Sequence, residues 1–228
     1  TASRDEQRER TPALAPEIYR QNGKKLLYPK DTVAGGTWIA IQENGNIMVL
    51  LNGALEKHVR QPPYRKSRGL ILLDLVSSDS SVTAFNRAGL DQIEPFTAIL
   101  VEGGNLFSCQ WNGSLRSVKK LNSGSPHIWS SVTLYDPAAT EKREDWFRAW
   151  LTGNPIPSSQ DILRFHQETG DGDPRNDLLM NRSDNVFTHS ISSVFLAGRL
   201  ARFHYLDLRA MKTASRTIRF SKAIPVNA

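Results

Sequence analysis

Five basic or titratable side chains lie close together in the stretch HVRQPPYRKSRG, residues 58–69. They are His58, Arg60, Arg65, Lys66 and Arg68. Cationic donors at this density can bind a carboxylate or a phosphate. Two prolines interrupt regular structure here, so the alternative is a solvated basic loop that leads into a helix. The residues alone leave both interpretations open.

Asn52 is a second candidate, because it ends the most apolar strand of the chain. Residues 37–53 read TWIAIQENGNIMVLLNG, with two apolar runs on either side of an Asn-Gly pair that suits a tight hairpin turn. The second run, 47–51, is apolar at every position, which predicts a central strand covered on both faces. Such a strand needs helices or a second sheet above and below it. Asn52 then places a polar side chain at the strand end.

Other catalytic signatures are absent from the sequence. It contains no GxxxxGK[ST] or GxGxxG phosphate loop and no GxSxG nucleophile turn. The five histidines, at 58, 127, 166, 189 and 204, show no metal-ligand spacing. The acidic loop ETGDGDPRND fails as a calcium loop, because Asn176 stands where a glycine is needed and Arg182 where a glutamate is needed. We therefore expect no metal site.

Composition limits the classes of function. The 228 residues are 39% hydrophobic and 23% charged, and the net charge of +6 favours acidic partners without requiring them. The only cysteine, Cys109, excludes an internal disulfide and fits a reducing compartment, so we expect a cytoplasmic protein. No apolar run approaches the ~20 residues of a membrane helix. The C-terminal part is basic but carries no recognisable nucleic-acid-binding module, so nucleic acid is not an expected partner.

The remaining pattern mixes strands with helices. Helices are expected at 67–77, 81–91, 137–151 and 159–169, and further strands at 95–101, 105–111, 115–121, 129–135, 186–196, 199–208 and 217–220. Residues 4–10 are densely charged and are expected to form a solvated loop, with irregular links up to residue 36. Trp146, Phe147 and Trp150 lie on one face of their helix, which predicts a core stripe. No repeat or linker interrupts the chain, so residues 1–228 are expected to form one domain.

Five fragments follow one another in the first 69 residues. They are SRDE at 3–6, YPKD at 28–31, AGGTWIA at 34–40, LLNGA at 50–54 and PYRKSRG at 63–69. Shorter ones follow at EPFT (94–97), WNG (111–113) and SSVTLYD (130–136). Together they resemble the NRDE family, also called the transport and Golgi organisation protein 2 family. Ser3 stands where the family motif has Asn, and the Met-Cys and first strand with which members usually begin are missing before Thr1.

The resemblance implies a fold and a chemistry. The family is grouped with the N-terminal nucleophile hydrolases, whose α+β fold is a four-layer αββα sandwich of two antiparallel sheets between helices. In such enzymes the first residue attacks a carbonyl and its own α-amine acts as the base. The resemblance assigns Asp5 to the α-ammonium, Arg4 to the negative charge of the site and Asn52 to the oxyanion. Thr1 would lie inside the second strand of the family, so the nucleophile is expected upstream of it and the chain from Thr1 is expected to be inactive.

Two functions from different classes follow from the resemblance. The first is hydrolysis of a linear amide or acyl substrate, and the second is a non-catalytic carrier or chaperone for haem or for lipid and acyl-CoA ligands. The small-molecule ligand is then expected to contact Glu6, Gly36, Trp38, His58, Arg65 and Arg68. No resident cofactor is expected, and haem enters only as a cargo. A third interpretation leaves Arg4, Asp5 and Asn52 to brace the strand ends. The sequence sets no oligomeric state.

Overall fold

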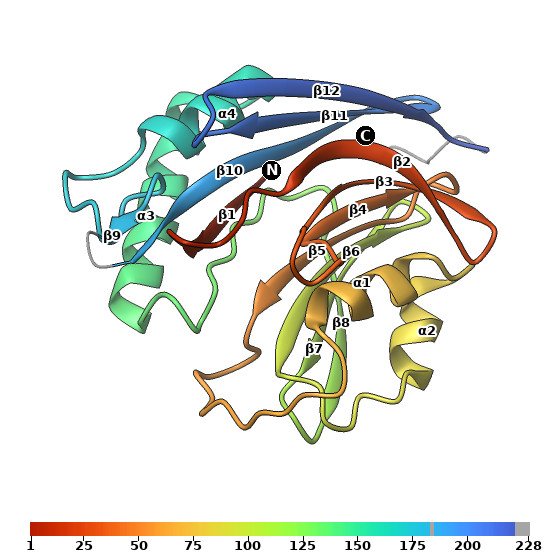
Figure 1. The fold of residues 1–228 in the computed structure, drawn as a ribbon. Helices are drawn as coiled ribbons and strands as arrows, with labels where there is room; N and C mark the ends of the chain where they lie inside the picture. The colour runs from red at the N-terminus through yellow and green to blue at the C-terminus, as the bar shows by residue number, and fades with distance from the viewer. Residues whose placement is uncertain (183–184, 222–228) are drawn as a thin grey trace.

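Two antiparallel sheets lie face to face in the computed structural model, which describes residues 1–182 and 185–221 (Figure 1). The first, which we call the β5 sheet, has seven strands in sequence order. They are β2 (Leu14–Gln21), β3 (Lys24–Lys30), β4 (Ile39–Gln42), β5 (Ile47–Asn52), β6 (Phe96–Glu102), β7 (Asn105–Trp111) and β8 (Arg116–Leu121). The second, the β1 sheet, runs in the order β1-β10-β11-β12, with β9 paired to β10. Its strands are β1 (Ala2–Gln7), β9 (Asn181–Arg182), β10 (Val186–Ala197), β11 (Leu200–Asp207) and β12 (Lys212–Arg219).

Helices lie outside each sheet. α1 (Arg68–Val76) and α2 (Ser81–Arg87) pack against the β5 sheet, whereas α3 (Pro137–Gly153) and α4 (Ser159–Glu168) lie beside the β1 sheet (Figure 1). This order of layers confirms the predicted α+β sandwich. All four expected helices form, and each begins after a polar cap that accepts a backbone N–H. The caps are Ser67, Ser80, Asp136 and Ser158. None of the described helices is long and apolar enough to cross a bilayer.

The predicted central hairpin is confirmed. β4 and β5 pair around a turn in which Gly45 has a φ of 97°. β5 is the fourth of seven strands, and its apolar run is continuous because alternate side chains enter two different cores. Met48 packs in the core beneath α1 and α2, whereas Ile47 packs between the sheets in the same cluster as Phe203. The strand that ends in Asn52 is therefore held from both faces.

The expectation of loops before residue 36 is wrong. Residues 2–7 form β1, which pairs with β10, and the link that follows contains β2 and β3. Pro16 is tolerated in β2 because this strand lies at the edge of its sheet, where a missing N–H breaks no ladder. The charged residues and prolines of this segment therefore hid three strands, β1, β2 and β3, from the sequence analysis.

Residues 129–135, which were expected to form a strand, form an irregular segment with a turn at 132–134. The amides of Leu134 and Tyr135 both donate to the Ser131 carbonyl at 3.0 Å, so the turn uses backbone groups that a ladder would need. The neighbouring aromatic stripe is half-buried instead of forming a core. Its members Phe147 and Trp150 pack α3 against Phe165 of α4, with ring centroids 5.6 and 4.8 Å away.

Gly36 and Gly69 allow α1 to approach the chain that precedes β4. A Cβ added at Gly36 would lie 2.5 Å from the carbonyl carbon of Gly69, and one added at Gly69 would lie 2.8 Å from the carbonyl oxygen of Thr37. Both neighbours are backbone atoms, which have no alternative rotamer. The first turn of α1 therefore depends on the absence of side chains at these two positions.

We expect Gly36→Ala to lower the free energy of unfolding by about 2 kcal/mol, because crowding a packed site costs roughly 1–3 kcal/mol. Gly89→Ala is the matched control, since a Cβ at Gly89 meets nothing within 4 Å. Urea unfolding of the two variants measures the difference. Equal stabilities would show that the approach of α1 does not require glycine at position 36.

Candidate functional site

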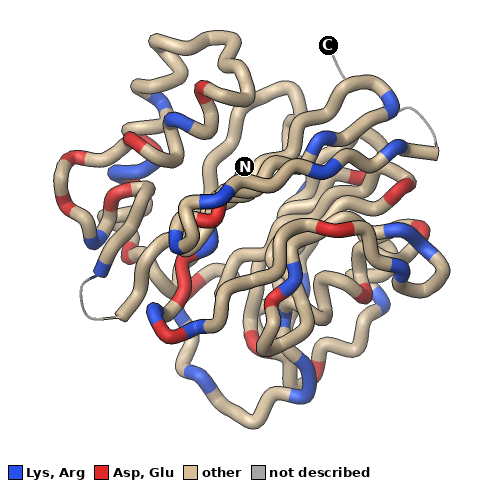
Figure 2. Tube along the Cα trace, turned by 45° about the horizontal axis from the view of Figure 1, so that its top comes forward, with Lys and Arg blue, Asp and Glu red and all other residues tan. Residues whose placement is uncertain are grey.

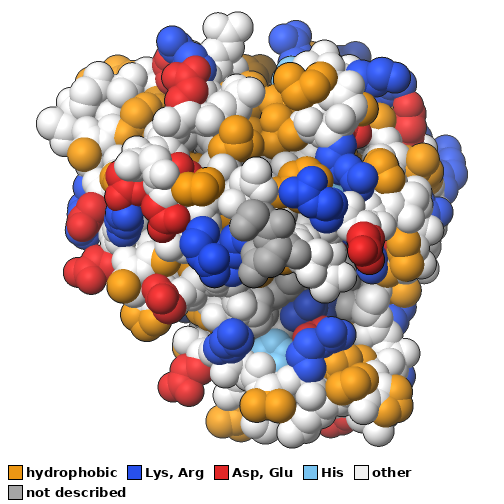
Figure 3. Space-filling model, turned by 60° about the vertical axis from the view of Figure 1, so that its left-hand side comes forward, with side chains coloured by type: hydrophobic (Ala, Val, Ile, Leu, Met, Phe, Trp, Pro, Cys, Tyr) orange, Lys and Arg blue, Asp and Glu red, His pale blue; other side chains and the backbone are white. Residues whose placement is uncertain are grey.

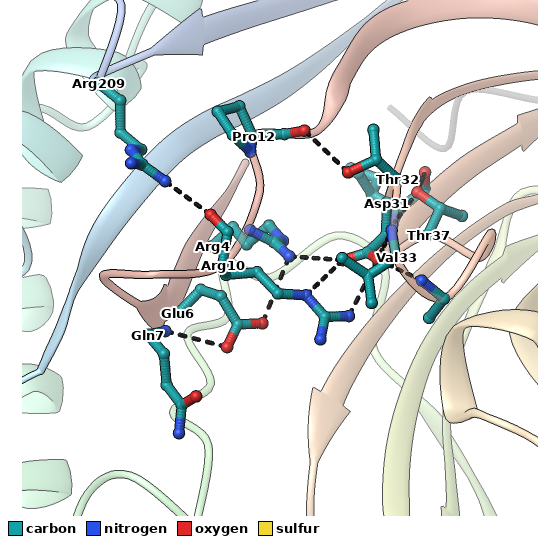
Figure 4. Close-up of polar contacts among 12 residues, drawn as sticks. Arg4, Glu6, Gln7, Arg10, Pro12, Asp31, Thr32, Val33, Thr37 and Arg209 are labelled. Carbon is teal, nitrogen blue, oxygen red and sulfur yellow. Dashed lines mark hydrogen bonds and ion pairs between the residues drawn. The ribbon is translucent and has the colours of Figure 1, made fainter.

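β1 sends neighbouring side chains to opposite faces of its sheet, as the alternation of a strand requires. Ser3 points to the helix side, where its Oγ lies 3.0 Å from Nδ1 of His166 on α4. Arg4 points to the other side, toward the loop between β3 and β4 (Figure 4). Figure 2 shows acidic and basic positions following one another along the chain close to the N-terminus. Arg4 and Asp5 are adjacent in sequence but have different surroundings.

Arg4 forms a buried ion pair that joins the two sheets (Figure 4). Its guanidinium donates to Asp31 Oδ2 at 2.7 Å and to Glu6 Oε2 at 3.3 Å. It also stacks on Trp38, 4.8 Å from the ring centroid. Arg10 pairs with the other oxygen of Asp31 at 2.9 Å. One carboxylate thus holds two guanidinium groups at the end of β1.

The surroundings of Asp31 favour its charged form. Its Oδ1 accepts the amides of Val33 at 3.0 Å and Ala34 at 2.7 Å. Burial alone would raise the pKa of Asp31, but the Ala34 hydrogen bond and the charges of Arg10 and Arg4 outweigh burial and hold the pKa below its ordinary value. The ion pair with Arg4 is therefore present at neutral pH.

Asp5 is held by two hydroxyl groups. Tyr135 donates to Asp5 Oδ2 at 2.8 Å, and Thr188 donates to Asp5 Oδ1 at 2.6 Å. Burial and then the charge of Asp5 raise the pKa of Tyr135, so its hydroxyl stays protonated and donates. The Arg143 guanidinium covers the Tyr135 ring at 3.6 Å from the centroid. Asp5 forms no ion pair with any side chain of residues 1–182 and 185–221.

Residues 131–135 connect Asp5 to the end of β5. Ser131 Oγ donates to the Asn52 carbonyl oxygen at 2.9 Å, and Tyr135 at the other end of the segment donates to Asp5. Gly53 makes room for this segment, since a Cβ there would lie 2.5 Å from Val132 Cγ2. Asn52 is half-buried, and its side-chain amide forms no hydrogen bond with another described residue. The segment therefore brings the end of β5 and Asp5 to the same end of the sandwich.

Three members of the basic loop gather around Glu94. His58, Arg60 and Arg68 each lie 3.2 Å from its carboxylate. Burial lowers the pKa of Arg68, and the charges of Glu94 and, more weakly, Glu6 act against this. The face drawn in Figure 3 is hollowed between two lobes, and basic side chains lie on both sides of the hollow. All three basic side chains of this group therefore contact one carboxylate of the chain.

One residue from the predicted contact set, Arg65, lies apart from Arg4 and Glu94. Arg65 donates to the carbonyl oxygens of Gly89 at 2.6 Å and Asp91 at 3.4 Å, so it braces the end of α2. Gly36 meets the backbone of Gly69, and its carbonyl oxygen accepts the Asp31 amide at 2.8 Å, so it lies beside the partner of Arg4. The other predicted residues, Glu6, Trp38, His58 and Arg68, lie around Arg4 or Glu94.

Four residues of this arrangement escaped the sequence analysis. They are Asp31, Glu94, Tyr135 and Thr188. The first three stand inside the fragments YPKD, EPFT and SSVTLYD, so the signal was present although no role was attached to it. Thr188 stands outside every such fragment and lies 183 positions from Asp5, so only the pairing of β1 with β10 reveals it.

The described residues include no obvious internal nucleophile. Cys109 is buried, and burial followed by the charge of Glu102 raises its pKa to about 12. The hydroxyl of Thr1 forms a hydrogen bond with Ser193 Oγ at 2.9 Å. Within the described residues, no group of three His, Cys, Asp or Glu side chains could hold a metal ion.

Comparison with known proteins places these features in a family. The profile of the family described as Transport and Golgi organisation 2 matches residues 1–202. The chain belongs to the transport and Golgi organisation 2 family. This confirms the resemblance drawn from the fragments of residues 3–136. No curated protein sequence matched this chain.

Solved structures show the same fold. A variant of conjugated bile acid hydrolase from Clostridium perfringens is similar to this chain, with a TM-score of 0.52 and 14% sequence identity. The alignment covers 91% of this chain and 85% of the hydrolase. A second variant of that hydrolase has a TM-score of 0.39 and 12% identity, over 90% of this chain and 84% of the other. The first likeness shows an N-terminal nucleophile hydrolase-like fold, and at this identity it shows the fold alone.

We expect Tyr135→Phe to lower the free energy of unfolding by about 1–3 kcal/mol, because it leaves an oxygen of Asp5 without its buried donor. Tyr19→Phe is the control, since the Tyr19 hydroxyl forms no hydrogen bond within the described part of the chain. Urea unfolding compares the two variants with the wild type. A loss no larger than that of the control would contradict the role given to the Tyr135 hydroxyl.

We expect Asp31→Asn to cost about 3 kcal/mol of unfolding free energy at pH 7, because it leaves Arg4 buried without its main partner. The pKa of Asp31 is lowered in the folded state, so its contribution is present above the unfolded value of about 4 and is lost as the pH falls through the folded value. The gap between wild type and variant should therefore close below about pH 4. The free energy of unfolding of wild type and variant, measured by urea unfolding between acidic and neutral pH, tests this prediction. The exposed Asp79→Asn is the control. A gap that persists unchanged into acid would refute the assignment.

Proposed function

We propose that this protein is an N-terminal nucleophile-type hydrolase of a linear amide or similar acyl substrate. The nucleophile is a cysteine encoded before Thr1, which becomes the first residue of the mature enzyme. The observation that supports this best is the state of Asp5. Both of its oxygens accept hydrogen bonds from neutral hydroxyls, and no described cation pairs with it. Such a carboxylate is fixed in position and still able to receive an ammonium group.

The position of β1 agrees with a nucleophile placed beside Asp5. β1 stands at the end of its sheet, so the described residues place a strand on only one of its edges. A strand that precedes Thr1 and turns back along the open edge would bring its first residue alongside Asp5. Asp5 would then bind the α-amine and orient it toward the thiol.

The proposed reaction proceeds in two stages. The thiol gives its proton to the α-amine and attacks the amide carbonyl, and the free side-chain amide of Asn52 donates to the oxyanion. The C–N bond breaks as the α-ammonium returns the proton to the leaving amine, which leaves a thioester. Water then attacks the thioester, with the α-amine as the base, and the C–S bond breaks to release the carboxylic acid and return the proton to the thiol. Arg4 lies on the other face of β1, where its contacts with Asp31 and Glu6 hold the strand that carries Asp5.

We expect the chain extended by its encoded upstream residues to release amine from at least one member of a panel of N-acylated amines. Asp5→Asn should lower kcat/KM by about 100-fold or more, since the α-amine loses its partner. The exposed Asp145→Asn is the control for loss of one charge. The chain that begins at Thr1 should release no amine. Amine release by the chain that begins at Thr1 would count against the proposal. So would a kcat/KM of the extended chain that does not change in Asp5→Asn.

A carrier function has one observation of its own. Next to Asn52, a pocket of ≈340 Å³ is lined by residues 54–58 together with Pro95 and Asn112, and Leu55 and Val59 are exposed close by in the sequence. This mixture of polar and apolar surface suits a small amphiphilic cargo such as a lipid or haem. Saturable binding of haemin, without amine release by the extended chain, would favour the carrier. In either case we place the protein in the cytoplasm, because its one cysteine is buried and unpaired.

A further inference from the structure

Two arginines from the turns that follow β1 and β11, the strands that flank β10, lie against one aromatic ring. Phe187 lies near the start of β10, opposite Glu6 of β1. The Arg8 guanidinium lies 5.1 Å from the centre of the Phe187 ring, and that of Arg209, just after β11, lies 5.8 Å from it. Arg8 and Arg209 are both exposed. The ring thus holds two cationic groups at the open end of the sheet.

Neither arginine is neutralised by a carboxylate of residues 1–182 or 185–221. Arg209 uses one N–H to bind the Arg10 carbonyl oxygen at 2.6 Å, which fixes its guanidinium and leaves further donors free (Figure 4). The nearby guanidiniums of Arg4 and Arg10 differ in this respect, because both pair with Asp31. The positive charges of Arg8 and Arg209 are therefore not balanced by an ion pair within the described residues.

His189 supplies a buried polar group at the same place. Its ring lies 4.3 Å from the Phe187 ring, and it is only 4% exposed. No well-formed hydrogen bond joins either ring nitrogen to a described residue, although the backbone of Gln7 lies near the ring. In the strand register Arg4 pairs with Ser190 and Asp5 pairs with Thr188. His189 is therefore the extra residue of a β-bulge. Bulges change the direction in which side chains point. A buried ring nitrogen without a hydrogen bond costs free energy, so a water molecule or a ligand group is expected to bind it.

We propose that Arg8, Arg209 and His189 form a binding site for an anionic group, a phosphate or a carboxylate, carried by a small molecule. The two guanidinium groups bind the anion from the solvent side, and one His189 ring N–H donates from beneath. A guanidinium presents parallel donors that match the oxygens of either anion. The site does not depend on the hydrolase proposal, because it contains neither Asp5 nor Asn52 and its test measures binding without turnover.

We expect calorimetric titration of the chain with inorganic phosphate, and separately with acetate, to show saturable binding of at least one ion. Arg209→Ala and Arg8→Ala should each weaken that binding at least tenfold. Arg202→Ala, which removes an exposed arginine of β11 without a carboxylate partner in the described chain, should change it less than twofold. Preference for phosphate or for acetate identifies which anion the natural ligand carries.

His189 gives a second, independent readout. Its imidazole carbon-bound proton resonance should shift in proportion to occupancy when the same ion is titrated, and His189→Phe should weaken binding while keeping the ring contact with Phe187. The proposal is overturned if neither ion saturates, if the His189 resonance does not move, or if Arg202→Ala weakens binding as much as Arg209→Ala. The arginine variants are at exposed positions, so they test the site even if His189→Phe fails to fold.

Discussion

The ion pair between Arg4 and Asp31 is the contact on which the arrangement of the candidate site depends. It crosses from the β1 sheet to the loop after β3, and both side chains are almost fully buried. A buried charge is tolerated only when its partner and its hydrogen bonds are complete. Asp31 meets this demand with two guanidinium groups and two backbone amides, so the first strand is attached to the other sheet at a defined position. Asp5, one residue further along, is placed by the same constraint.

The alternation of β1 divides the site into two chemically different halves. On the Arg4 face, cations and carboxylates are paired across the sheets, and Trp38 packs beneath the guanidinium. On the Asp5 face the carboxylate is surrounded by neutral hydroxyl donors instead. Adjacent residues of one motif therefore have different surroundings, because Arg4 is paired with carboxylates and Asp5 accepts only neutral donors among the described residues. This is why the charged tetrapeptide can be essential to the fold without all of its members touching a ligand.

Much of the architecture could be predicted because local pattern and tertiary environment agree. The 47–51 run is apolar throughout, and the structure covers it with α1 and α2 on one face and the second sheet on the other. Prediction failed where the two disagree. β1 carries charges that are paired only after the sheets meet, and residues 129–135 have strand-forming side chains whose backbone is used in a turn. The partners of Arg4 and Asp5 could not be derived, since contacts between residues distant in the sequence leave no periodic trace.

The order of the strands has a consequence for synthesis of the protein. The β5 sheet is built from strands that are consecutive in sequence, so each can pair as soon as its neighbour has emerged from the ribosome. β1 pairs with β10, which is made only after all seven strands of the β5 sheet. We infer that the nascent chain carries the charged segment 4–10 unpaired until β10 emerges. Its dense charge, which misled the analysis of the sequence, keeps an unpaired strand from joining other chains during that interval.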